Sequence, residues 1–387
     1  MAHSLSPQSP PNAIKVLHVI HWPNSGITSF LKNFLRHKGD SRFRYHVLFF
    51  LCDPVELSAF RTICSFADCL HFDRNRLNSL IRYWRVIRRL SPDIIHTHSF
   101  QPGLWGRIFR IGTKARIVST IHSPYPYFSE KSPLKRIKAF AETLSMNLAN
   151  SRTICISDAV RQHVEKCTGI RSELLTVIRN GIERQSPGPD PTSLAETRRE
   201  ITSDDSARII MTIGRLDKEK GLDVLLTAFS NLLKRARGIA LAIIGGGPLE
   251  KTLKEQAIDL GIEKHVYFLG FKPDVRRYLA VSDLYVSAAR YEGLGMSLIE
   301  ALAAGISVVA TRVDGIPEVI EHERTGILVE PDNPEMLADA MLKLLNCEST
   351  RNRFRENGLK RVAEHFEISG VVDRYEDLYL RCLAAKE

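Results

Sequence analysis

Two glutamates eight positions apart, Glu292 and Glu300, stand in a segment suited to binding hydroxyl groups. Glu292 lies in a short glycine-containing stretch that follows an apolar run, and Glu300 lies inside the predicted helix that comes next. A carboxylate can accept hydrogen bonds from hydroxyls, which offer donors without charge. A solvated helix position would explain Glu300 alone, but not the pair in this setting. The spacing therefore predicts a site for a polyhydroxylated ligand.

The start of the same helix offers a second kind of contact, through its backbone. Gly295 precedes the predicted helix, and Met296 and Ser297 are its first residues. The N–H groups of a first helical turn have no partner within the helix, and the positive end of the helix dipole lies there as well. Such a terminus binds phosphate readily. The two glutamates would then flank an anion site.

Two cations follow another predicted strand, at 208–213. Arg215 and Lys220 lie on the loop that leads from this strand into a helix. Fixed positive charges at that place can neutralise a diphosphate whose negative charge grows as it leaves during a reaction. Their neighbours Lys218 and Glu219 are typical of a solvated turn.

Three consecutive glycines, 245–247, follow a third predicted strand and precede a helix. Gly246 at their centre would let a ligand approach the backbone closely. A tight strand-to-helix turn explains the triplet equally well. The third glycine of the G-x-G-x-x-G pattern is absent, which disfavours a nicotinamide enzyme.

Four stretches in this order resemble the donor half of a retaining GT-B glycosyltransferase of the family 4 type: 214–221, 245–248, 292–305 and 315–326. The resemblance implies that Arg215, Lys220 and the backbone at 295–296 hold the diphosphate of a nucleotide-sugar. Glu300 would bind the ribose hydroxyls and Glu292 those of the transferred hexose. Neither a catalytic metal nor another cofactor is expected, because GT-B enzymes work without one.

The N-terminal half matches the family more loosely. Gly26 follows the first strand at the place where the family usually has Gly-Gly, although Ser25 departs from that pattern. His122, directly after the strand at 116–121, corresponds to the family histidine near the reacting sugar. A neutral imidazole there can donate or accept a hydrogen bond. A purely structural histidine is the alternative.

His96 and His98 are two positions apart at one strand end, so both side chains point to the same side of the sheet. Such a pair could begin a zinc site, but no third ligand of suitable spacing follows in the sequence. We therefore predict no metal site, and an acceptor-side or packing role for both rings.

Short runs rich in Val and Ile alternate with amphipathic stretches along the whole chain, which predicts βαβ units in the α/β class. Strands are expected at 16–20, 45–50, 69–72, 93–97, 116–121, 153–156, 175–178, 208–213, 240–244, 265–269, 284–287, 307–311 and 326–329. The expected GT-B architecture is two doubly wound Rossmann-like domains facing each other across a cleft.

The predicted organisation has five parts. They are a disordered tail at 1–13, an acceptor-binding domain at 14–184, a proline-rich linker at 185–206, a nucleotide-sugar-binding domain at 207–368, and a C-terminal helix at 369–387 that packs back toward the N-terminal domain.

Charge separates the two halves of the chain. Residues 1–183 hold 26 Lys and Arg against 12 Asp and Glu, whereas the remainder holds 28 against 32. Basic clusters with aromatic neighbours at 82–89 and 124–138 suit a phosphate-bearing lipid or an anionic membrane surface, and plain solubility is the alternative. No nucleic-acid partner is expected.

Two absences bear on the cellular location. The seven cysteines have no metal-ligand spacing, and no apolar run is long enough to span a bilayer. We expect a cytoplasmic protein, with peripheral contact at the inner face of the cytoplasmic membrane left open.

We therefore expect a retaining enzyme that moves a hexose or N-acetylhexosamine from a nucleoside-diphosphate sugar to a saccharide or lipid-linked acceptor. A UDP-sugar is preferred to GDP-mannose as the donor, and cell-surface polysaccharide or glycolipid synthesis is the expected setting. A nucleotide-sugar epimerase on the same fold and a non-catalytic sugar-nucleotide-binding protein are the open alternatives.

Overall fold

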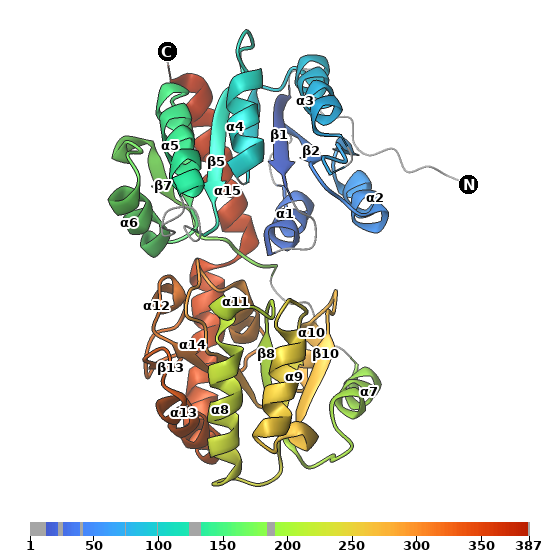
Figure 1. Ribbon diagram of the computed structural model, residues 1–387, viewed down its shortest axis with the longest axis vertical. Coiled ribbons are helices and arrows are strands. Elements are labelled where there is room, and N and C mark those ends of the chain that lie inside the picture. Colours follow the sequence, from blue (N-terminus) through green and yellow to red (C-terminus); the bar gives the residue numbers. More distant parts are fainter. Residues whose placement is uncertain are drawn as a thin grey trace, which may run out of the picture. The chain divides into compact units, whose positions relative to one another are not determined.

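The computed structural model describes residues 13–21, 26–38, 42–73, 75–98, 100–123, 133–183 and 190–385. The chain forms two compact units, each built on its own parallel sheet (Figure 1). Unit 1 comprises the chain up to Asn180 together with the segment from Ile368 onward, and unit 2 comprises Gly181–Glu367. None of the described helices is both long and apolar enough to cross a membrane.

Unit 1 has a seven-stranded sheet in the order β3-β2-β1-β4-β5-β6-β7. Its strands are β1 (Ile14–Ile20), β2 (Phe43–Phe49), β3 (Phe66–Cys69), β4 (Ile94–Thr97), β5 (Arg116–Ile121), β6 (Arg152–Cys155) and β7 (Leu175–Val177). Only β3 lies well away from its expected place at 69–72. The reason is His71, whose φ of 52° interrupts the extended backbone after Cys69.

The helices of unit 1 begin where polar side chains satisfy free N–H groups. Asp53, Asn75 and Ser157 each accept a hydrogen bond from the first turn of α2, α3 and α6. The helices are α1 (Gly26–Arg36), α2 (Pro54–Ile63), α3 (Arg76–Leu90), α4 (Phe100–Phe109), α5 (Pro133–Leu148), α6 (Asp158–Cys167), the short η1 (Ser172–Leu174) and α15 (Ile368–Ala384).

The last helix, α15, completes the core of unit 1 although it lies far away in the sequence. Tyr375 and Tyr379 are fully buried in one apolar cluster with Phe34 of α1 and Tyr45 of β2. The hydroxyl of Tyr45 also donates to Glu376 at 2.7 Å. A second cluster on the opposite face packs β1 and β4 against α3, including the buried Tyr83. Both faces of this parallel sheet are therefore covered.

Unit 2 has a six-stranded sheet in the order β10-β9-β8-β11-β12-β13. Its strands are β8 (Arg208–Ile213), β9 (Ile239–Ile244), β10 (Val266–Gly270), β11 (Leu284–Ser287), β12 (Val308–Thr311) and β13 (Gly326–Val329). Its helices are α7 (Pro191–Ile201), η2 (Lys218–Lys220), α8 (Leu222–Leu233), α9 (Glu250–Asp259), η3 (Glu263–His265), α10 (Arg276–Ala280), α11 (Met296–Ala303), α12 (Ile316–Val319), α13 (Pro334–Asn346) and α14 (Glu348–His365).

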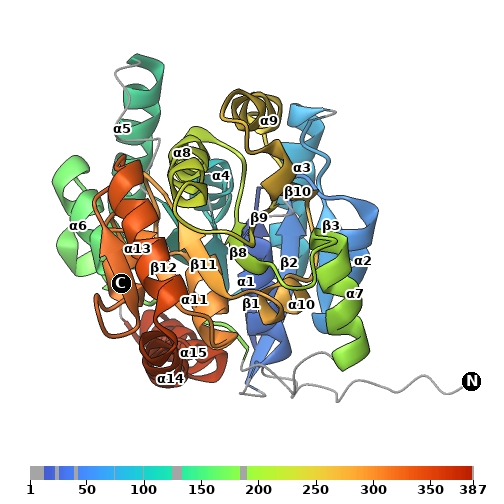
Figure 2. The same cartoon turned by 90° about the horizontal axis from the view of Figure 1, so that it is seen from below.

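Helices cover both faces of the second sheet: α8 and α9 lie on one side, and α11 and α14 on the other (Figure 2). Helix α7 occupies much of the expected linker. Its Glu200 accepts hydrogen bonds from the Tyr278 hydroxyl and pairs with Lys272 and Arg277, so α7 is attached to unit 2.

The order of strands reverses once in each unit, between β1 and β4 and between β8 and β11. At such a point the loops after the two strands leave in opposite directions, and ligands of open parallel sheets bind there. The loops after β8 and β11 carry the charged residues that the sequence singles out.

Candidate active site

An ion pair joins the loops that follow β8 and β11. Nζ of Lys220 lies 2.6 Å from Oε2 of Glu292, and the two side chains are 27% and 16% exposed. Desolvation opposes the charge on the lysine, but Glu292, Asp217 and Glu219 together raise the pKa of Lys220 above its usual value. The lysine is therefore charged at neutral pH. The sequence predicts that Lys220 binds the diphosphate and Glu292 the hexose of one ligand, and the structure places these two side chains next to each other.

Backbone geometry fixes the position of Lys220. Asp217 caps the short helix η2 by accepting from the Glu219 N–H, and Gly221 follows with φ of 60°. A β-carbon at Gly221 would stand 2.0 Å from the carbonyl oxygen of Ala288, which lies just after β11. Glycine is therefore required where the two loops touch.

Asp314 and Gly315 hold the backbone of Glu292. Asp314 accepts a hydrogen bond from the Glu292 N–H at 3.0 Å, and the Gly315 N–H donates to the Glu292 carbonyl at 3.1 Å. A β-carbon at Gly315 would meet the carbonyl oxygen of Gly293 at 2.2 Å. This packing explains why a glycine begins the fourth stretch of the motif series.

Arg290 is a central residue that sequence reasoning missed. It forms a two-pronged pair with Asp223 at 2.7 and 2.8 Å, and it also donates to the Lys218 carbonyl and to Asp332. These bonds lower the pKa of Asp223 and raise that of Arg290. Its position two residues before Glu292, three residues after a predicted strand, was the available signal. Arg290 ties the Lys220 loop to the Glu292 loop.

Arg215 lies on the same loop as Lys220 but does not share its pair. Its guanidinium contacts Asp217, and its side chain is 68% exposed. The structure thus leaves most of this guanidinium accessible to a ligand.

The glycine triplet divides into two roles. A β-carbon at Gly245 would lie 1.8 Å from the carbonyl oxygen of Gly214. A β-carbon at Gly247 would lie 2.5 Å from the carbonyl oxygen of Leu216. Gly246 instead borders open space, and its carbonyl accepts from the Leu216 N–H at 3.0 Å. The outer glycines are needed for packing, and only Gly246 has room beside it.

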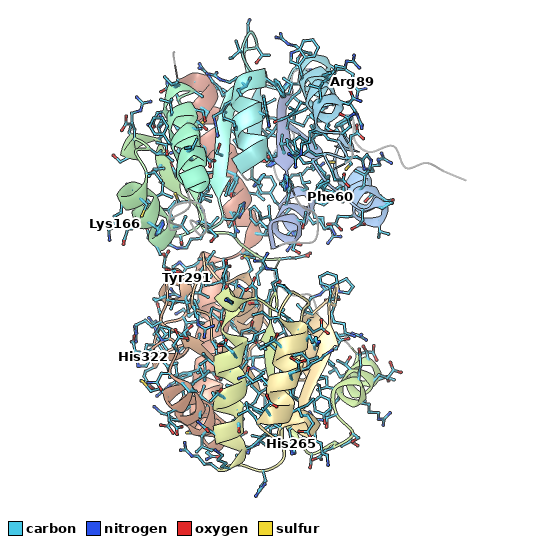
Figure 3. All side chains as sticks on the ribbon, viewed as in Figure 1. Phe60, Arg89, Lys166, His265, Tyr291 and His322 are labelled. Carbon is cyan, nitrogen blue, oxygen red and sulfur yellow. The ribbon has the colours of Figure 1, made fainter. Side chains whose placement is uncertain are left out.

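Gly295, which has φ of 90°, directly precedes helix α11, and no side chain caps the helix. Met296 and Ser297 in its first turn are half-buried, and the loop before them is marked by the exposed Tyr291 in Figure 3. Burial, with a smaller contribution from Asp274, raises the pKa of Glu300 to about 7. No hydrogen bond or ion pair holds this carboxylate within the described part of the chain.

Two predicted residues belong to unit 1. Gly26 is exposed at the start of α1, and His122 is half-buried directly after β5. Burial lowers the pKa of His122 to about 3, so its ring is neutral at pH 7. Ser25 and the aromatic stretch 124–128 lie outside the described residues.

Two family models cover most of the chain. "Glycosyltransferase Family 4" matches residues 14–186, and "Glycosyl transferases group 1" matches residues 194–361. The chain belongs to the group 1 glycosyltransferases. The resemblance to glycosyltransferases that rests on the four motif stretches is thereby confirmed, as is the enzyme class, whereas retention of configuration stays a prediction.

Individual relatives differ in the substrates that their names give. The N-acetyl-alpha-D-glucosaminyl L-malate synthase of Bacillus anthracis is 28% identical over 298 residues, 76% of each chain. The GDP-mannose-dependent alpha-(1-6)-phosphatidylinositol monomannoside mannosyltransferase of Mycobacterium tuberculosis (strain CDC 1551 / Oshkosh) is 34% identical over 174 residues, 43% of this chain and 45% of that one.

The crystal structure of Anabaena Alr3699/HepE in complex with UDP-glucose has the same fold. Its TM-score is 0.82 at 19% sequence identity, and the match covers 95% of this chain and 100% of that one. The GT-B fold expected from the sequence is confirmed.

Replacing Arg290 by Ala should loosen both loops of the site. We expect unit 2 to lose about 1–3 kcal/mol of stability, measured by denaturant unfolding, because several charge-assisted hydrogen bonds disappear. Nucleoside-diphosphate affinity should fall at least tenfold in calorimetry. Arg312→Ala, which removes an exposed arginine 3.8 Å from Glu330, is the control. Unchanged affinity in Arg290→Ala would contradict its positioning role.

Glu300 should make nucleotide binding release protons. Its folded pKa of about 7 reflects burial, and ribose hydroxyls donating to the carboxylate would favour the ionised form. Affinity for UDP or GDP should therefore increase as pH rises from about 6 to 8. Calorimetry in buffers of different ionisation heat measures the protons released. Glu300→Gln should remove that release and exposed Glu356→Gln should retain it; equal release in the two variants would exclude Glu300 as its source.

Proposed function

We propose that this glycosyltransferase moves a hexose or N-acetylhexosamine from a nucleoside-diphosphate sugar to a saccharide or lipid-linked acceptor with retained configuration. The observation that carries the proposal is the charged pair of Lys220 and Glu292 beside the uncapped start of α11. This arrangement offers a cation, backbone N–H groups and a carboxylate within one edge of a parallel sheet. Those are the groups that a diphosphate and a hexose need.

Each of these groups has a separate role when the donor binds. The diphosphate takes Lys220 as its counter-ion, with Arg215 and the N–H groups of Met296 and Ser297 around it. Glu292 is then released from the lysine and accepts hydrogen bonds from the hexose hydroxyls. Glu300 accepts from the ribose hydroxyls. Charge that develops on the leaving diphosphate is stabilised by groups already in place.

Retention follows from attack on the face that the diphosphate leaves. The bond from the anomeric carbon to the phosphate oxygen breaks, and the acceptor oxygen bonds to that carbon from the same side. The acceptor proton passes to the departing phosphate oxygen, so no enzyme carboxylate forms a covalent intermediate. His122 contributes a neutral ring beside the transferred sugar.

The donor is proposed to be a UDP-sugar. The solved structure of similar fold was determined with UDP-glucose, whereas the mycobacterial relative is named for GDP-mannose. The loop after β10 carries the discriminating contacts in this proposal, and its Phe271 side chain is 66% exposed. An exposed ring at this edge of the sheet is available for stacking on a nucleobase.

A panel of nucleotide-sugars tests the function, first by thermal shift and then by product formation with lipid-linked acceptors. We expect a UDP-sugar to give the largest stabilisation.

Lys220→Ala and Glu292→Gln should each lower kcat/KM at least a hundredfold while the protein remains folded. Glu250→Gln is the matched control, because its pair with Lys254 has a similar length, 2.7 Å, on an exposed helix. Full activity in Lys220→Ala or Glu292→Gln would refute the assignment, and donor turnover without an acceptor would favour the epimerase.

An anionic membrane surface is proposed as the place where unit 1 meets its acceptor. Fifteen large apolar side chains are exposed in the described residues, and nine of them belong to α3, α4 with its following turn, and α5. They are Leu77, Ile81, Trp84, Ile108, Ile111, Ile137, Phe140, Leu144 and Leu148. Helix α4 contacts both α3 and α5, so the three helices adjoin (Figure 1).

Positive charge accompanies these apolar residues. Arg85, Arg88 and Arg89 are exposed on α3, where Arg88 lies 5.7 Å from the Trp84 ring and Arg89 is labelled in Figure 3. Apolar side chains together with arginines suit the interface of a bilayer that contains anionic lipid.

Vesicle flotation tests this surface. The protein should bind vesicles of phosphatidylglycerol and phosphatidylcholine, and bind pure phosphatidylcholine weakly, with loss of binding at high salt. The double variant Ile137→Ser, Phe140→Ser should bind the anionic vesicles about tenfold less, because it removes two apolar side chains from the interface. Val55→Ser, at an exposed position on α2, should bind like the unchanged protein. Equal binding by the double variant would exclude α5 as the contact.

A further inference from the structure

Four histidines lie close together at the carboxyl edge of the unit 1 sheet. His18 on β1 is the register partner of His96 on β4, His98 follows β4, and His122 follows β5. The His96 and His98 rings stack with centroids 4.4 Å apart and planes 17° from parallel. His18, His96 and His98 are fully buried. The transferase site uses only His122, so three buried rings remain without a role.

Hydrogen bonds link three of these rings in a row. Nδ1 of His18 lies 2.9 Å from Nε2 of His98, and Nδ1 of His98 lies 3.2 Å from Nε2 of His122. The imidazoles therefore form a continuous path from the interior of β1 to the residue after β5. Every link joins the δ nitrogen of one ring to the ε nitrogen of the next.

His96 supports this row from the side without belonging to it. Its Nδ1 lies 2.6 Å from the hydroxyl of Tyr379 on α15, and its Nε2 lies 2.7 Å from the hydroxyl of Thr120 on β5. With both nitrogens engaged, the His96 ring is held in one orientation. It presents a fixed flat face to His98.

The three linked rings are neutral. Burial lowers the pKa of His18 and of His122 to about 3, and burial together with the neighbouring imidazoles lowers the pKa of His98 well below its usual value. A neutral imidazole has one N–H group and one lone pair. Two hydrogen bonds in a row of three neutral rings therefore require every ring to donate in the same direction.

Only two arrangements of protons satisfy this requirement. If donation runs from His18 toward His122, each ring carries its proton on Nδ1, and Nε2 of His18 keeps an unused lone pair. If donation runs the other way, each ring carries its proton on Nε2, and His18 buries an unpaired N–H. Nε2 of His18 has no partner within the described residues. An orphaned buried N–H is the rarer arrangement in proteins, which favours donation toward His122.

We propose that His98 and His18 are positioning residues that hold His122 in the tautomer with its proton on Nδ1. His122 then offers a hydrogen-bond donor, rather than an acceptor, to an oxygen of the sugar being transferred. The use of that donor rests on the proposed function. The arrangement of protons follows from the row of rings alone.

A metal ion is the competing explanation, because ligand atoms of His18, His96 and His98 lie within 4.8 Å of one another. The planes of these three rings lie 17–32° from one another, and lone pairs in the planes of rings stacked in this way point past one another rather than toward one ion. Both nitrogens of His96 and of His98 are also engaged in hydrogen bonds. A zinc ion needs lone pairs directed at it from about 2.0–2.1 Å, so the row of hydrogen bonds fits these contacts better.

Nitrogen NMR of the histidine-labelled protein tests the tautomer directly. Long-range proton–nitrogen correlations at pH 7 should show a protonated Nδ1 and an unprotonated Nε2 for His122, assigned through the signals lost in His122→Gln. A protonated Nε2, or averaged signals from both tautomers, would overturn the proposal. Stoichiometric zinc in the purified protein would overturn it as well. This measurement needs no substrate, so it decides the arrangement of protons even if the proposed transfer reaction fails.

Kinetics test whether the row acts through His122. His18→Phe should lower kcat about tenfold and leave the donor KM within twofold, since the His122 ring stays in place and only its preference for the Nδ1-protonated tautomer is lost. In a His122→Ala background the same change should have no further effect. His46→Phe is the control, because His46 is buried on β2 with both nitrogens unpartnered in the described chain, and it should leave kcat unchanged. Independent, additive losses from His18→Phe and His122→Ala would contradict the coupling.

Discussion

The candidate site depends on two loops meeting at hydrogen-bond distance although they leave the sheet in opposite directions. The contact of Lys220 with Glu292 exists because backbone touches backbone around it, at Gly221 against Ala288 and at Gly315 against Gly293. A side chain at either glycine would push the loops apart. Arg290 then holds the two loops together through its ion pair with Asp223 and its hydrogen bond to the Lys218 carbonyl. The geometry of the candidate site therefore depends first on the close approach of backbone segments and second on charged pairs.

The strands and the motif residues could be predicted because their signals are local. Alternating apolar runs located all thirteen strands of the described residues, and only β3 was displaced, by the backbone conformation of His71. Lys220 and Glu292 stood out because each follows a strand in a glycine-containing loop. That they pair with each other could not be read from spacing, since 72 positions separate them and the contact arises from strand order.

The missed residues owe their roles to three-dimensional neighbours. Arg290 is one arginine among many in the sequence, and only the fold brings it to Asp223 and Asp332. The row of imidazoles joins His18 of β1 to His98 and His122, which follow β4 and β5, and its direction depends on Nε2 of His18, which has no partner among the described residues. The glycine triplet shows the same limit, because only packing separates Gly246 from its two neighbours.

Helix α15 has a consequence for the order in which the protein is made. Unit 2 is continuous in sequence, so all of its strands are synthesised before the segment of unit 1 that starts at Ile368. Unit 1 begins first but lacks Tyr375 and Tyr379, which with α1 cover one face of its sheet, until all of unit 2 has been synthesised. Domains usually fold as they emerge, from the N-terminus onward. Here the N-terminal sheet acquires its last layer after the C-terminal one is complete, so the newly made chain passes through a stage with an apolar sheet face still uncovered.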